Sequence, residues 1–120
     1  MTSPTALTIK EDDYSVHYDS DSNTVVFAGE LQLSGMDDYA SIMTLLDDVV
    51  QQEPTTLTLD LRQLEFLNSS GINMLLRLVI KVREKTGMQL IVKGSDRVSW
   101  QSRSLQNLKR LMPALELQIE

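Results

Sequence analysis

The chain has 120 residues, of which 42% are hydrophobic and 23% are charged, so it suits one folded domain and is too short for two. It has no cysteine and one histidine, which excludes disulfide bonds and thiolate chemistry and argues against a metal centre. Its apolar runs are too short to span a bilayer, and its first residues lack the basic-then-apolar order of a signal peptide. We therefore expect a cytoplasmic protein with no membrane segment and no cofactor.

The net charge of −6 hides opposite charges in the two halves of the chain. Residues 1–60 contain one basic residue, Lys10, and twelve acidic ones, whereas residues 61–120 contain ten basic and five acidic ones. The favoured interpretation is that the halves interleave in one fold and partly neutralise each other. The alternative is that the basic half presents a patch to an acidic partner. Nucleic acid is a poor candidate, because the acidic half would repel phosphates.

The first predicted elements are the two strands of a hairpin. Alternating and β-branched residues predict strands over 14–18 and 24–28, with a polar turn between them. Residues 1–13 read as a polar N-terminal tail, so the folded domain is expected over 14–120.

A helix is predicted after the hairpin. Ser34 is placed as its N-cap, with Asp37 and Asp38 in the first turn, where the helix dipole favours carboxylates. The helix ends before a proline, and apolar residues at three- and four-residue spacing predict its buried stripe: Ile42, Leu45, Leu46, Val49 and Val50.

A second helix is predicted from a cap at Asn68 or Ser69 to a stop at Gly87. Its predicted core stripe is Ile72, Leu75, Leu76, Val79 and Val82. The other predicted elements are a strand before this helix and, after it, a strand, a third helix or two short ones, and an edge strand: 57–61, 89–93, 98–112 and 115–119. The alternation of strands and helices predicts a small α/β layer, with right-handed crossovers onto a mixed, mostly parallel sheet.

The segment Asn68-Ser69-Ser70-Gly71 is the most informative part of the chain. It follows an apolar strand and opens the second helix, where hydroxyl groups meet unpaired N–H groups and the positive end of the helix dipole. Such hydroxyls serve as caps and also suit a phosphate. On local chemistry alone, a simple capped helix is the plainer interpretation.

This segment resembles the signature of the STAS domain of bacterial anti-sigma factor antagonists. In that family a strand, a loop with an inward aromatic and the run Asp-Ser-Ser/Thr-Gly open the second helix. Position by position, Phe66 matches the aromatic, Ser69 the serine that a partner kinase phosphorylates, Ser70 the second hydroxyl and Gly71 the glycine.

A second motif supports the resemblance, because Gly29-Glu30-Leu31 matches the family's Gly-Glu-Leu-Asp after the early hairpin. The order of elements agrees over about residues 14–119. The chain departs from the family at Asn68, where the usual residue is Asp, and at Gln32, where it is also Asp. These changes remove negative charge near the expected phosphorylation site, and they indicate a divergent subgroup.

The resemblance implies a non-enzymatic partner-switching regulator of transcription, controlled by phosphorylation of Ser69, with Ser70 as the second choice. It also implies a serine kinase that is itself an anti-sigma factor, with a histidine-kinase-like ATPase fold, and a metal-dependent phosphatase that removes the phosphate. The downstream target, a sigma factor, a cyclase or another effector, stays open. The alternative is a STAS-like ligand-binding or scaffolding module without a phosphorylation switch.

An enzyme is not expected from the residues themselves. His17 lies on a predicted hairpin strand far in sequence from Ser69, so nothing pairs a base with a serine nucleophile. The glycines are isolated from one another, so the chain has no glycine-rich phosphate loop.

The face of the second helix opposite its predicted core is the expected docking surface. At about 100° per residue, Asn73, Arg77, Lys81 and Lys85 form a stripe that Ser69 begins, and Met74 falls beside it, poorly placed for the core. The alternative is a solvated face with no partner. The expected partner-binding residues are Asn68, Ser69, Ser70, Gly71, Asn73, Met74, Arg77 and Lys81.

Overall fold

The computed structural model describes residues 8–35 and 37–120, and it contains one six-stranded sheet whose strands follow each other in space as they do in the chain. The first three strands pair antiparallel and β3 to β6 pair parallel. This confirms the predicted α/β layer with a mixed sheet. The elements are β1 (Thr8–Lys10), β2 (Tyr14–Asp19), β3 (Thr24–Leu31), α1 (Ala40–Gln51), β4 (Thr56–Leu67), α2 (Ser69–Arg83), β5 (Gln89–Gly94), α3 (Gln101–Leu111) and β6 (Glu116–Ile119).

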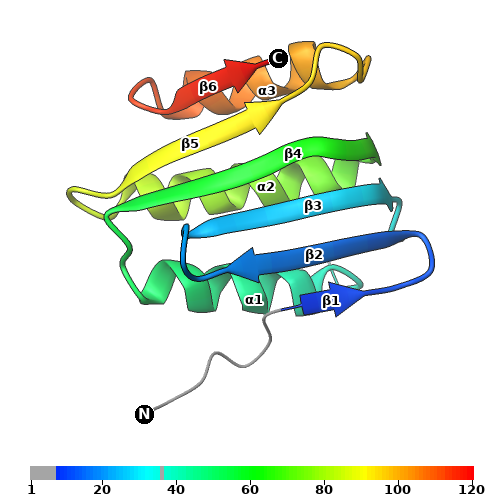
Figure 1. The fold of residues 1–120 in the computed structure, drawn as a ribbon, viewed down its shortest axis with the longest axis horizontal. Helices are drawn as coiled ribbons and strands as arrows, with labels where there is room; N and C mark the ends of the chain where they lie inside the picture. Colours follow the sequence, from blue (N-terminus) through cyan, green and yellow to red (C-terminus); the bar gives the residue numbers. More distant parts are fainter. Residues whose placement is uncertain (1–7, 36) are drawn as a thin grey trace.

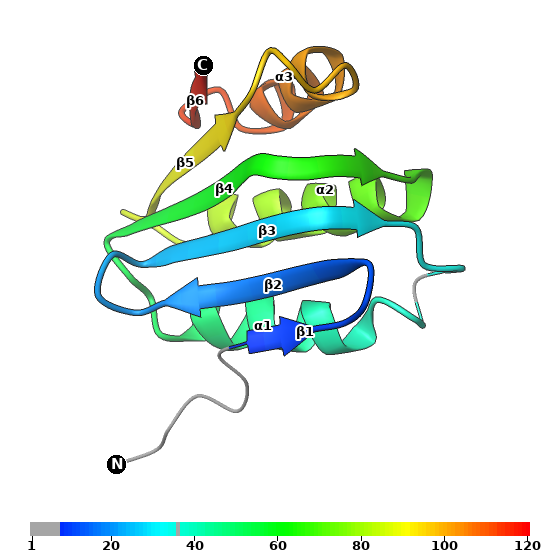
Figure 2. The same cartoon turned by 45° about the vertical axis from the view of Figure 1, so that its right-hand side comes forward.

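All three helices lie on the same face of the sheet, as the two views in Figures 1 and 2 show. The reason is that β3, β4, β5 and β6 advance in one direction, so right-handed crossovers return each connecting helix to the same side. The core lies between this face and the helices. Within the described ranges, the opposite face of the sheet is uncovered.

The acidic and basic halves of the chain lie side by side in this arrangement. The sheet order keeps β1, β2 and β3 together on one side and β4, β5 and β6 on the other (Figure 1). The boundary between the halves falls inside β4, so they do not interleave in the sheet, but the expected partial neutralisation is confirmed by the ion pairs between them. They meet along β3 and β4 and between α1 and α2, where Lys81 pairs with Asp47 and Lys85 pairs with Glu53.

The start of the chain and the start of α1 differ from the predictions. Thr8–Lys10, expected in the polar tail, is an edge strand paired with β2, and residues 1–7 lie outside the described residues. Helix α1 begins at Ala40, without a side-chain cap, rather than at Ser34. The buried stripe of α1 is confirmed. Before Ala40 the chain turns instead, with hydrogen bonds from the N–H of Asp38 to the oxygen of Gly35 and from the N–H of Ala40 to the oxygen of Asp37.

Strand β4 is longer than predicted, because residues expected in a loop continue the strand through two irregularities. Its register with β3 shifts between Val26 and Ala28 and again between Gly29 and Glu30. Each shift adds a residue on β4, so Leu61, Leu64 and Leu67 all face the core despite their three-residue spacing. That spacing does not look like a strand, which alternates with a period of two.

The first residues of α3 bind the part of β4 that has no partner on β5. Pairing between β4 and β5 stops at Asp60. Beyond it, the buried Gln101 amide donates to the carbonyl oxygens of Leu61 and Leu64 at 2.5 and 3.0 Å, and the Trp100 indole donates to Leu64 at 3.2 Å. These side chains therefore donate the hydrogen bonds that a neighbouring strand would otherwise donate to β4.

Candidate functional site at the start of helix α2

Asn68 caps α2 and ties it to the loop after β3. Its side-chain oxygen accepts from the backbone N–H of Gly71 at 3.0 Å, which satisfies one of the free donors of the first turn. Its amide nitrogen donates to the carbonyl oxygen of Leu33 at 2.8 Å, and its backbone N–H donates to that of Leu31 at 3.2 Å. Of the two predicted caps, Asn68 is the one confirmed.

Tyr39 completes this network from the residue before α1. Its hydroxyl donates to the side-chain oxygen of Asn68 at 2.7 Å and lies 3.3 Å from the carbonyl oxygen of Leu31. A tyrosine hydroxyl is protonated and a donor at neutral pH, and burial raises the pKa of Tyr39 further above its ordinary value. Gly71 makes room for the ring, because a Cβ there would lie 2.8 Å from that hydroxyl and 2.2 Å from Leu67.

The two serines of the motif differ in accessibility. Ser69 is exposed as the first residue of α2, and Ser70 is half-buried. Both lie at the positive end of the helix dipole, where an added anion is favoured. A kinase must reach the hydroxyl that it modifies, so the exposure of the two serines favours Ser69.

The Gly-Glu-Leu motif has a structural role on the neighbouring strand. Gly29 has a positive φ of 90°, and a Cβ there would lie 2.2 Å from the backbone oxygen of Asp13. The N–H of Glu30 donates to the same oxygen at 2.8 Å. Only glycine fits this close approach. The approach fixes the position of β3 just before Leu31, whose oxygen belongs to the Asn68 network.

The structure separates the expected partner-binding residues. Asn73 and Arg77 are exposed on α2, as expected, whereas Lys81 is half-buried in its ion pair with Asp47. Met74 is 1% exposed, so its expected place beside the exposed stripe is wrong. The helix is rotated from the predicted position, and its buried residues are Gly71, Met74, Leu75, Leu78, Val79 and Val82.

Phe66 also differs from its expected orientation. The family resemblance implies an inward loop aromatic at this position, but Phe66 lies on β4 and is 42% exposed. The second register shift of β4 turns it outward, opposite Glu30 of β3. Among the described residues, Phe66 is the exposed large hydrophobic side chain.

Asp60 and Arg62 form a charge cluster on β4. Arg62 donates to the two carboxylate oxygens of Asp60 at 2.9 and 2.7 Å and contacts Glu120 at 3.0 Å. The hydrogen bonds from Arg62 hold the pKa of Asp60 below its ordinary value, although burial opposes this. A cavity of 560 Å³ beside the cluster is lined by Arg62, Ser95, Asp96, Arg97 and Glu120.

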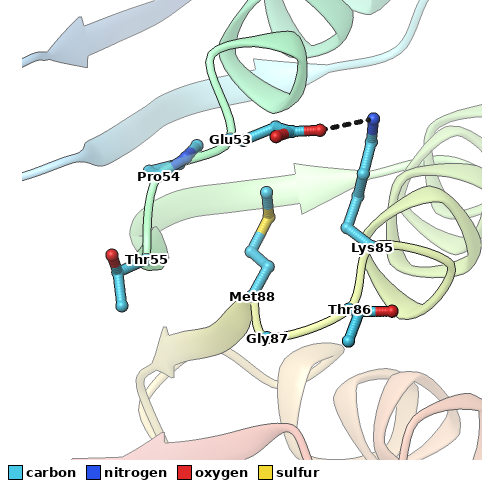
Figure 3. A pocket seen from close by; sticks show the side chains of 7 residues that line it. All are labelled: Glu53, Pro54, Thr55, Lys85, Thr86, Gly87 and Met88. Carbon is cyan, nitrogen blue, oxygen red and sulfur yellow. Dashed lines mark hydrogen bonds and ion pairs between the residues drawn. The ribbon is translucent and has the colours of Figure 1, made fainter.

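Another cavity, of 220 Å³, lies at the other end of the layer, between the loops that follow α1 and α2 (Figure 3). The Lys85 side chain points across it to Glu53, at 3.3 Å, and Met88 lies beneath them. Since this cavity is at the C-terminal ends of the helices, it is separated from Ser69 by the length of α2.

Other chemistry-bearing residues lie elsewhere. His17 shares a hydrogen bond of 2.7 Å with the hydroxyl of Thr8, on the edge of the sheet away from α2. Over residues 8–35 and 37–120, no group of three or more His, Asp and Glu residues could hold a metal ion. None of the described helices is long and apolar enough to cross a membrane.

Comparison with known proteins gives a family and two similar structures. The family model for the STAS domain matches residues 34–110. A chain in the crystal structure of the diguanylate cyclase SiaD in complex with its activator SiaC from Pseudomonas aeruginosa has a TM-score of 0.70 and 13% identity, covering 95% of this chain and 98% of that chain. An anti-sigma factor antagonist from Mycobacterium paratuberculosis has a TM-score of 0.61 and 22% identity, covering 91% and 88%. At these identities the structural likenesses concern the fold alone. The search of curated proteins found no match.

Proposed function

This chain belongs to the STAS domain family, and on that premise we propose that it is a partner-switching regulator of the anti-sigma factor antagonist type. In this proposal a serine kinase with a histidine-kinase-like ATPase fold binds the unmodified protein and phosphorylates Ser69. A metal-dependent phosphatase removes the phosphate. The observation that carries the proposal is the exposed Ser69 hydroxyl at the start of α2, beside a cap that Asn68 already provides.

The position of Ser69 explains how a phosphate would switch binding without unfolding the protein. Phosphorylation adds about −1.5 to −2 charges at neutral pH. The helix dipole favours this charge in the free protein. Because Asn68 rather than Ser69 holds the cap, modification leaves the network to Leu33 and Tyr39 intact. A partner that closes over the hydroxyl would have to bury a dianion, which is costly without cations to pair with it.

The test is phosphate transfer by purified kinases of this class from the same organism. Mass spectrometry after incubation with ATP should place the phosphate on Ser69. Ser69→Ala should abolish incorporation, and Ser70→Ala should retain it. Phosphate found only on Ser70 would move the switch to the less accessible hydroxyl, and no incorporation with any kinase of the class would refute the proposal.

A second candidate is a protein-binding module that acts without phosphorylation. It is favoured by Asn68, whose amide donates to Leu33 where the family's usual Asp could not. It is also favoured by the similarity to a structure in which an activator is bound to a diguanylate cyclase. For this candidate, incubation with the kinases and ATP should leave binding to the partner unchanged, whereas the first proposal requires that the phosphorylated protein bind its partner more weakly than the unmodified protein.

A further inference from the structure

The cavity of 560 Å³ lies where β4 and β5 separate. Pairing between these strands stops at Asp60, and β5 then turns away from β4 (Figure 2). The cavity is lined by one residue of β4, the three residues that follow β5 and the residue that follows β6. It therefore lies at the carboxyl ends of β5 and β6, the edge at which open parallel sheets bind their ligands. Its volume is within the range of about 300–1,000 Å³ that small-molecule sites have.

Every residue that lines the cavity is polar or charged, and the charges balance. The lining consists of two arginines, two acidic residues and one serine. A lipid or an aromatic ligand would meet no apolar residue against which to bury its surface. A ligand with a net charge would meet as many repelling groups as attracting ones. The lining therefore suits a small polar molecule that carries both charges and is neutral overall.

Arg62 is held in place by two acids and still has donors for a ligand. It donates to the carboxylate of Asp60 at 2.9 and 2.7 Å and to that of Glu120 at 3.0 Å. A guanidinium group has five N–H donors, so two of them remain. The Ser95 hydroxyl accepts from the backbone N–H of Arg97 at 3.2 Å, which leaves its own proton to donate. These donors suit a carboxylate.

Arg97 and Asp96 are the unpaired charges of the lining. Both are exposed, and neither forms an ion pair with any residue that the structure describes, although they are adjacent in the chain. Asp96 lies beside the second acid of the lining, because its backbone N–H donates to the backbone oxygen of Glu120 at 2.8 Å. Once the existing ion pairs are formed, the cavity therefore keeps one cation and one anion without a counter-charge.

We propose that this cavity binds the zwitterion of a polar α-amino acid. The α-carboxylate accepts hydrogen bonds from Arg97, the remaining donors of Arg62 and the Ser95 hydroxyl. The α-ammonium group donates to the carboxylates of Asp96 and Glu120. The side chain of the ligand occupies the rest of the cavity, where the polar lining selects a polar one. This site does not depend on phosphorylation of Ser69.

The test uses L-glutamine, whose polar, uncharged side chain keeps the whole molecule neutral. Binding is measured from the amide shifts of the isotope-labelled protein, at low salt in a buffer without amines or phosphate. The shifts should centre on residues 95–97 and saturate below about 10 mM ligand. Arg97→Ala should weaken binding about tenfold. The matched control is Arg103→Ala, which removes an equally exposed arginine of α3 outside the lining and should change affinity less than about twofold.

Two analogues test whether both charges of the ligand are recognised. N-acetylglutamine lacks the ammonium group and glutaminamide lacks the carboxylate, so each should bind at least about tenfold more weakly than L-glutamine. Saturable shifts with neither L-glutamine nor L-serine would overturn the inference, as would equal affinities of Arg97→Ala and Arg103→Ala. Tight binding of N-acetylglutamine would make this an anion site instead, and tight binding of glutaminamide a cation site. Shifts centred away from residues 95–97 would place the ligand outside this cavity.

Discussion

The amide nitrogen of Asn68 donates a hydrogen bond to the carbonyl oxygen of Leu33 across 2.8 Å, joining the start of α2 to the loop after β3. An ionised carboxylate has no proton to donate. The family's usual Asp would therefore set two oxygen acceptors against each other in this loop. The loop around Asn68 therefore requires an amide at this position. The hydrogen bond to Leu33 gives a physical reason for the departure from the family signature.

The first prediction concerns Asn68→Asp. Loss of the donor should lower the free energy of unfolding by about 1–3 kcal/mol at neutral pH, even though Asp is as good an N-cap as Asn. Urea unfolding measures the change, and the deficit should narrow in acid, where a protonated Asp regains a donor. Asn73→Asp, exposed on the same helix, is the control and should leave stability unchanged or slightly raised. An Asn68→Asp protein as stable as the parent would contradict the role of the Leu33 contact.

The second prediction concerns Gln101, which is fully buried. Its amide donates to Leu61 and Leu64 and accepts from the N–H of Ser95, so Gln101→Ala leaves three backbone groups without these partners. We expect a loss of about 2–4 kcal/mol in the free energy of unfolding. Gln106→Ala, exposed on the same helix, should stay within about 0.5 kcal/mol. Similar changes in both variants would contradict the role of the Gln101 hydrogen bonds, because Ala has a higher helix propensity than Gln and propensity alone would lower neither stability.

The third prediction is a pH dependence from Asp60. Because Arg62 lowers the pKa of Asp60 in the folded protein, the ionised carboxylate stabilises the fold above the ordinary pKa of about 3.9. That contribution is lost as the pH falls through the lower folded pKa. The stability difference between the parent and Asp60→Asn should therefore be largest near neutral pH and shrink in acid. Glu65→Gln, an exposed acid on the same strand, should show no such trend; a parallel trend in both would contradict the Asp60–Arg62 contact as its cause.

Much of the layer could be predicted from the sequence, because helical stripes and alternating strands are local patterns. The spacing in α1 was enough to identify its buried residues. On α2 the same spacing does not determine which side of the helix faces the core, because Ile72 and Leu76 are as apolar as the buried Met74 and Leu78. Contacts with the neighbouring helices set the orientation of α2 about its axis. Its side with Lys81 contacts α1, and its side with Arg83 contacts α3.

The candidate site was only partly predictable. The cap at Asn68 follows from local chemistry, and the serines follow from the family motif. The contacts from Asn68 to Leu33 and from Tyr39 to Asn68 join residues 35 and 29 positions apart, so no local pattern contains them. The shifts in β4 that turn Phe66 outward depend on its pairing with β3.

The last prediction concerns the charge that a phosphate would bring to Ser69. Ser69→Asp places a carboxylate in the first turn of α2, where the dipole should stabilise the fold by roughly 0.3–1 kcal/mol, less at high salt. Thermal unfolding at low salt measures the gain. The control is Thr86→Asp, exposed just beyond the other end of α2, where the same added charge meets the negative end of the dipole and should leave stability unchanged or lower.

The pair of variants also separates tolerance of the charge in the free protein from its effect on binding. Ser69→Asp should keep the fold and still bind the kinase more weakly than the parent, because its carboxylate faces the partner. Thr86→Asp should bind as the parent does. A Ser69→Asp protein that loses stability would show that the start of α2 does not accept a negative charge, and the switch would then act by disturbing the fold rather than by repelling the partner.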